Sequence, residues 1–279
     1  MNQQLIDYTL HLADSTLILS QRNAEWCGHG PVLEQDIAIT NISLDLIGQA
    51  RNFYQYAAQL INMQNNSEGV VSPSPLERHL SEAKNGSAAR GGEVSEDTLA
   101  YFRTERQFKN HLLVEQPNGD WAQTILRQFF FSNYQYLLYQ QLQHSKDETI
   151  AAIAAKALKE VTYHLRWSSE WVVRLGDGTE ESNERINKAI GELWMYAGEL
   201  LLPASYEQAL VKDGIIPDIT SFNNAWMNTV KEVFAEATLT IPEKSFAQSG
   251  GKEGKHSEYL GYILTELQYM QRTYPGANW

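Results

Sequence analysis

The chain has 279 residues, of which 43% are hydrophobic and 11% aromatic, so it can bury the core of one large domain. Its 34 acidic and 22 basic residues give a formal net charge of −12, which argues against binding to a nucleic-acid backbone. Cys27 is the only cysteine and no apolar run is long enough to cross a bilayer, so we expect a cytoplasmic protein without disulfides or membrane contact.

Apolar residues recur at helical spacing along the chain, and no segment alternates as a strand does, so the fold class is predicted to be all-α. All eight prolines fall between predicted helices or at their edges. The expected architecture is one domain, residues 1–279, built on a four-helix bundle with additional C-terminal helices. The predicted core helices cover about residues 2–25, 31–62, 121–144 and 146–175, and the extra helices lie within 179–273.

Local signals mark where these helices begin and what separates them. Pro31 suits the first turn of the second helix, and Asp120 is placed to cap the third. Ser145 and Glu148 have the spacing of a capping box for the fourth. Residues 64–96 are rich in Ser, Gly, Asn and Pro, which predicts a mobile connector between the second and third core helices.

The fourth helix carries two ionisable residues within its apolar stripe. Glu160 and His164 are four residues apart, so both point to the same side of the helix. On the second helix, Asp45 and Gln49 have the same spacing and border its apolar face. We therefore expect these four residues to meet in a polar centre between the two helices.

A metal site and a structural pair are both possible interpretations of this centre. A bundle that holds two metal ions usually takes a Glu from each of two helices and a Glu-x-x-His pair from each of the other two. The third helix contains no acid, and the only Glu-x-x-His spacing, Glu253 with His256, falls in a Gly-rich loop. We interpret the centre as a degenerate site without metal or catalytic residues, in which buried ionisable groups pair structurally.

Six segments of the chain resemble a known family. They are 19–29 (LSQRNAEWCGH), 44–53 (LDLIGQARNF), 105–108 (ERQF), 113–119 (LVEQPNG), 159–165 (KEVTYHL) and 250–256 (GGKEGKH). They resemble the structural subunits of the bacterial ring 1,2-phenylacetyl-CoA epoxidases, which are multicomponent ferritin-like monooxygenases. The resemblance extends from the N-terminus to Gln271 and Arg272 and implies a ferritin-like bundle. The connector at 64–96 is longer than in that family.

The resemblance also implies partners and cofactors. In the family, the di-iron centre and the binding of phenylacetyl-CoA belong to a homologous catalytic subunit, while the structural subunit has the same fold without the full ligand set. A small linking subunit, together with a reductase that holds flavin and an iron–sulfur cluster, completes the complex. The expectation for this chain is a non-catalytic structural subunit with no cofactor of its own, acting in phenylacetate degradation.

Two questions stay open at this point. The alternative to a scaffold is a metal-dependent oxidase that uses Glu160, His164 and Asp45. For the interface with a partner, we expect aromatic-rich faces and the loop from Gly250 to Gly261, with Gly250, Gly251, Lys252, His256 and Glu258 as candidates. The alternative is that this loop only closes the last helix onto its own bundle.

Overall fold

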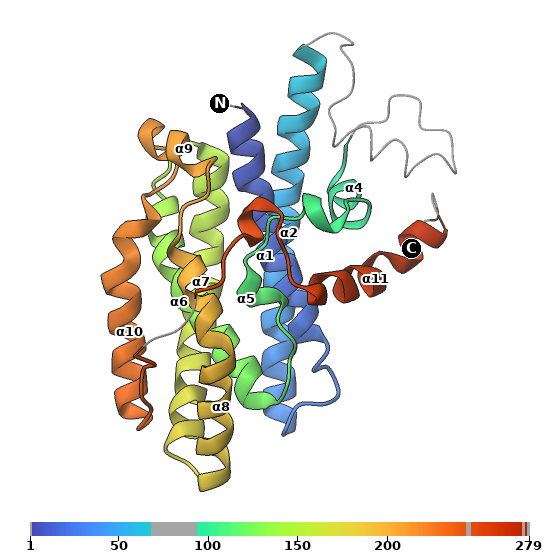
Figure 1. Cartoon of the computed structure of the whole chain (residues 1–279). Helices are drawn as coiled ribbons and strands as arrows, with labels where there is room; N and C mark the ends of the chain where they lie inside the picture. Colours follow the sequence, from blue (N-terminus) through green and yellow to red (C-terminus); the bar gives the residue numbers. More distant parts are fainter. Residues whose placement is uncertain (1, 68–93, 244–246, 275–276, 278–279) are drawn as a thin grey trace.

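In the computed structural model, which describes residues 2–67, 94–243, 247–274 and 277, every regular element is a helix and the described residues form no strand (Figure 1). The elements are α1 (Asn2–Ala24), α2 (Leu33–Ser67), α4 (Glu96–Tyr101), η1 (Glu105–Gln107), α5 (Leu112–Glu115), α6 (Trp121–Leu142), α7 (Glu148–Gly176), α8 (Glu180–Ala197), η2 (Gly198–Leu201), α9 (Glu207–Asp213), η3 (Ile219–Phe222), α10 (Asn223–Glu236), η4 (Gly251–Glu253) and α11 (Glu258–Thr273). The predicted all-α, ferritin-like fold is confirmed.

Two antiparallel hairpins form the bundle. Helices α1 and α2 pack along their length, as do α6 and α7, and α2 also contacts α7 across the bundle (Figure 1). Helices α8 and α10 pack against α6 and α7 on the outside, while α11 extends to the other side and contacts α4 and α5. The short connection after each first helix explains the antiparallel arrangement.

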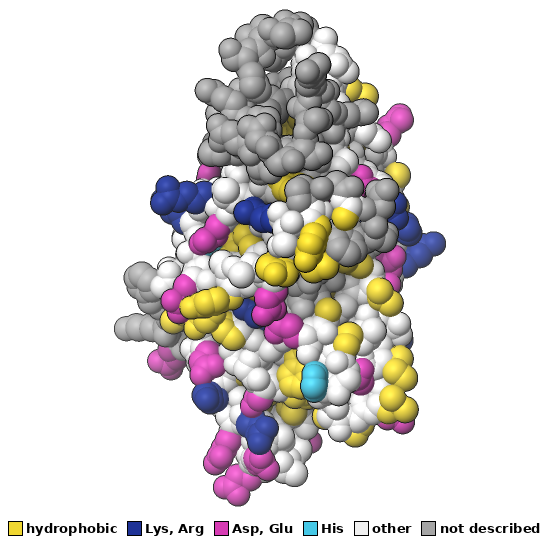
Figure 2. Space-filling view, turned by 90° about the vertical axis from the view of Figure 1, so that its right-hand side faces the viewer, with side chains coloured by type: hydrophobic (Ala, Val, Ile, Leu, Met, Phe, Trp, Pro, Cys, Tyr) yellow, Lys and Arg dark blue, Asp and Glu magenta, His cyan; other side chains and the backbone are white. Residues whose placement is uncertain are grey.

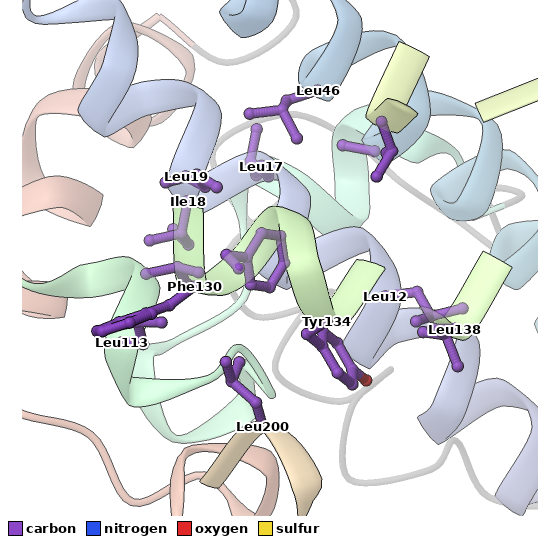
Figure 3. Close-up of a cluster of buried hydrophobic side chains, with 14 of the residues drawn as sticks. Leu12, Leu17, Ile18, Leu19, Leu46, Leu113, Phe130, Tyr134, Leu138 and Leu200 are labelled. Atoms are coloured by element: carbon purple, nitrogen blue, oxygen red, sulfur yellow. The ribbon is translucent and has the colours of Figure 1, made fainter. Parts of the chain in front are cut away.

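The core is one continuous cluster of buried apolar side chains that runs from Leu5 to Leu264. Figure 3 shows part of it, where α1, α2, α5, α6 and η2 meet; the labelled residues are Leu12, Leu17, Ile18, Leu19, Leu46, Leu113, Phe130, Tyr134, Leu138 and Leu200. Burying one such side chain contributes about 1.5–3 kcal/mol, so packing rather than helix propensity holds the bundle together.

Several predicted boundaries need correction. The capping box of Ser145 with Glu148 is wrong, because Asp147 is the N-cap of α7 and accepts the Ile150 N–H at 2.9 Å. Ser145 instead donates to the Ile215 carbonyl oxygen at 2.6 Å. The second helix begins at Leu33 rather than at Pro31, and it continues to Ser67. The predicted connector at 64–96 lies largely outside the described residues.

Other sequence signals are confirmed. Asp120 caps α6, since its side chain accepts the Gln123 N–H at 3.1 Å. The apolar stripe of α7 faces α2, where the indoles of Trp167 and Trp171 both donate to Gln35 Oε1, at 3.0 and 2.7 Å. Within the described part of the chain, no helix is both long enough and apolar enough to cross a membrane.

Candidate functional site: a polar centre between two core helices

The four residues predicted to form a polar centre do lie together, as two pairs that bridge α2 and α7. His164 Nε2 donates to Asp45 Oδ2 at 2.9 Å, and Gln49 Nε2 donates to Glu160 Oε2 at 2.9 Å. The His164 side chain is fully buried, whereas 36% of the Asp45 side chain is exposed. The helical i, i+4 spacing on both elements brings about this meeting, because it places each pair on the facing sides of the two helices.

Helix α6 closes the centre from inside with neutral groups. Gln135 Nε2 and the Tyr139 hydroxyl both donate to Gln49 Oε1, each at 3.4 Å. Burial raises the pKa of the Tyr139 phenol well above its ordinary value, so this group stays protonated and can only serve as a neutral hydrogen-bonding partner at physiological pH.

The centre opens to solvent through a groove of about 200 Å³ between α2 and α7. Leu44, Gly48, Lys156 and Glu160 are among the residues that line it. Partial burial raises the pKa of the Glu160 carboxyl, the Gln49 hydrogen bond lowers it, and the Asp45 charge raises it again, with a net increase. The environment therefore favours the neutral form of Glu160 more than water does.

These residues do not fit a di-iron site. Such a site in a bundle draws on four carboxylates and two imidazoles from four helices. Here α2 and α7 supply two carboxylates and one imidazole, each already hydrogen-bonded, and α6 contains no Asp, Glu or His. Among the described residues, no three His, Cys, Asp or Glu side chains come together in a way that could hold a metal ion.

A second set of buried polar groups, which the sequence does not reveal, fixes the segment 103–117 to α1. Arg103 is fully buried and its guanidinium binds the carboxylate of Asp14 on α1 through two nitrogens. The Tyr54 hydroxyl donates to Asp14 Oδ1 at 2.5 Å, and Lys109 N–H donates to Oδ2 at 2.8 Å. With four donors the buried carboxylate is satisfied, so Asp14 has a structural role here.

Three further glutamates fix the loop that precedes α11. Glu199 Oε1 accepts the N–H groups of Gly250 and Gly251, at 2.7 and 2.8 Å. Lys252 Nζ binds Glu207 Oε2 at 2.7 Å, with 3% and 1% of the two side chains exposed. A Cβ at Gly251 would overlap the carbonyl oxygen of Asn110, which is why this position accepts only glycine.

His256 and Glu115 form the third of these contacts. His256 Nδ1 lies 2.9 Å from Glu115 Oε2, and Nε2 lies 2.9 Å from the Phe108 carbonyl oxygen. Both ring nitrogens face acceptors, so the doubly protonated, charged form of the ring satisfies both contacts at once. Burial alone would lower the pKa of His256, but the hydrogen bond and charge of Glu115 raise it above its ordinary value. Glu253 binds Ser205 N–H at 2.9 Å instead of pairing with His256.

The interface prediction for this loop is therefore corrected in part. Gly251 and Lys252 are buried and the His256 side chain has no exposed surface, so these groups pack inside the chain's own bundle. Gly250 is half-buried and Glu258 is exposed, so for these two residues the interface role stays a prediction.

The helical bundle, whose polar centre has fewer carboxylates and imidazoles than a di-iron site, defines the chain as an all-α, ferritin-like protein. Comparison with known proteins identifies the family: residues 1–279 match the family described as phenylacetic acid catabolic protein, and the chain belongs to it. Over 276 residues, which cover 99% of both chains, it is 45% identical to the C component of the 1,2-phenylacetyl-CoA epoxidase of Escherichia coli (strain K12).

Proposed function

We propose that the chain is a non-catalytic structural subunit of a multicomponent di-iron monooxygenase that epoxidises phenylacetyl-CoA in aerobic phenylacetate degradation. Two observations support the proposal. The similarity to an epoxidase subunit extends over 99% of both chains. The polar centre at Glu160 and His164 has too few carboxylates and imidazoles for two irons. The groups that are present already have partners, since His164 pairs with Asp45 and Glu160 accepts a hydrogen bond from the Gln49 amide. The second observation carries the assignment to a non-catalytic role.

In this proposal the chain supports a homologous catalytic subunit, which holds the di-iron centre and the substrate. A small linking subunit, together with a reductase that holds flavin and an iron–sulfur cluster, belongs to the wider complex, and the chain itself binds no cofactor. A cytoplasmic location agrees with the single, exposed Cys27 thiol, which a reducing compartment would keep free.

Reconstitution tests the proposal. The purified chain is expected to show no epoxidation of phenylacetyl-CoA, and the catalytic subunit is expected to gain activity when the chain is added. Glu160→Ala in the reconstituted complex separates scaffold from oxidase, with Glu192→Ala on the exposed side of α8 as control. A scaffold retains turnover in both variants once the complex has assembled. Loss of turnover in Glu160→Ala alone, with assembly intact, would contradict the proposal.

A further inference from the structure

Helix α2 carries an apolar stripe on the side that faces away from the bundle. The exposed fractions of its members are 72% for Leu33, 51% for Ile37, 62% for Leu44 and 40% for Ile47. The opposite side of the same helix packs into the core through Ile39, Ile42, Leu46, Ala50 and Phe53. A helix that is apolar on two opposite sides is normally buried on both.

The surface around this part of the molecule is otherwise mixed. Figure 2 looks from the side on which α2 and α11 lie in Figure 1, and it shows hydrophobic side chains reaching the surface in patches among charged ones. Single exposed apolar residues need no explanation, but four on one helix face do.

The middle part of the outer side of the neighbouring helix α7 is basic. Lys156, Lys159, Tyr163 and Arg166 follow at steps of three or four, so they share one face, and all are exposed. The Arg166 guanidinium lies 5.8 Å from the centre of the Tyr163 ring. In a chain with a formal net charge of −12, three bases on one helix face form a local positive ridge.

The groove between the two helices joins the apolar stripe to the basic ridge. Leu44 and Gly48 line it on the α2 side and Lys156 on the α7 side, and the carboxylates of Asp45 and Glu160 also line it. A Cβ at Gly48 would meet nothing within 4 Å, so the backbone of α2 is open to close approach at this point. The three features together make one surface, called the α2/α7 surface below, whose apolar stripe extends about 21 Å along α2 at 1.5 Å per residue.

We propose that the α2/α7 surface is the docking site for a helix of the catalytic subunit, and that this helix carries an apolar stripe bordered by carboxylates. The inference rests on the proposed function. The stripe supplies the apolar contact and the ridge selects an acidic partner, because like charges facing each other are repelled. A second copy of this chain fits less well, since a two-fold axis near α7 would bring Lys156, Lys159 and Arg166 close to the same bases.

Two independent variants test the surface by titration calorimetry against the purified catalytic subunit. Leu44→Glu introduces a charge into the apolar stripe, and its control is Leu202→Glu, at a leucine that is 47% exposed away from this surface. Lys156→Glu with Arg166→Glu reverses the ridge, and its control is Lys188→Glu with Lys231→Glu, two exposed bases on α8 and α10. Circular dichroism verifies that each variant is folded.

We expect each test variant to raise the Kd at least about tenfold and each control to change it less than about twofold. The ridge variant should also bind with less dependence on salt.

If the wild-type chain binds its catalytic partner and both test variants bind as tightly as the wild type, the proposed docking surface is wrong and the scaffold role stands. If the test variants disrupt only self-association of the isolated chain, the surface belongs to a second copy. If the wild-type chain does not bind at all, the scaffold proposal itself is wrong.

Discussion

Replacing His256 by alanine would remove the buried imidazolium between Glu115 and the Phe108 carbonyl. Glu115 would keep two donors, Asn110 Nδ2 at 2.8 Å and Ser257 N–H at 2.6 Å, but it would lose its only cationic partner within hydrogen-bonding distance among the described residues. Breaking a buried ion pair costs about 3–5 kcal/mol, and the two remaining donors favour the lower end, about 3 kcal/mol. At about 2 °C per kcal/mol for a chain of this size, the Tm should fall by about 6 °C.

The same pair predicts how stability depends on pH. The pKa of His256 is raised in the folded state relative to about 6.5 in the unfolded chain. Below the unfolded value the contribution of the charged ring is fully present, and it is lost as the pH rises through the folded pKa. The wild-type chain should therefore lose stability above about pH 6.5, while His256→Ala should lack this part of the decline.

Urea unfolding followed by circular dichroism between pH 6 and pH 9 measures both effects. His29→Ala is the matched control, because His29 is exposed and its removal should leave the free energy of unfolding nearly unchanged. If His256→Ala is as stable as the wild type, or if both lose stability with pH to the same extent, the His256–Glu115 pair does not contribute the stability assigned to it.

Three further substitutions test other parts of the structure. Arg103→Met leaves the buried Asp14 without its cation and should lower the free energy of unfolding by about 3–5 kcal/mol in urea titrations; a change under about 1 kcal/mol would contradict the pairing. Glu160→Gln keeps a hydrogen-bond acceptor but cannot ionise. Because folding raises the pKa of Glu160, the wild type loses stability when this carboxyl ionises, and the variant does not. The variant should therefore be as stable as the wild type in acid and more stable above the folded pKa of Glu160. Equal stability across the pH range would argue against a raised pKa for Glu160. Gly254 has a φ of 77°, and a Cβ at this position would overlap the Arg106 carbonyl oxygen. Gly254→Ala should therefore introduce about 1–3 kcal/mol of strain and lower the Tm. An unchanged Tm would show that the loop adapts to the added methyl group.

The polar centre was predictable because helical periodicity alone places its members. Asp45 and Gln49, like Glu160 and His164, are four residues apart within long helices, so each pair had to share a face and only the pairing of α2 with α7 remained to be found. The long helices followed from the same periodicity. The start of α7 did not, since Ser145 and Asp147 are both good caps and the chain's path selects the second.

The buried loop contacts were beyond sequence reasoning. Asp14 and Arg103 are 89 residues apart, and nothing near either one indicates the other. Lys252 lies in a Gly-rich segment that is typical of an exposed loop, yet it is buried because Glu207 and the Leu202 carbonyl meet its ammonium group. Such contacts depend on how separate elements pack, which local patterns do not encode.

In the proposed scaffold, the polar centre between α2 and α7 does not hold a pair of irons. Metal analysis of this chain, assembled with its catalytic partner in iron-containing medium and then separated from it, measures that directly. We expect iron in the partner and none in stoichiometric amount in this chain. Two tightly held irons per molecule of this chain, lost in Glu160→Ala, would contradict it.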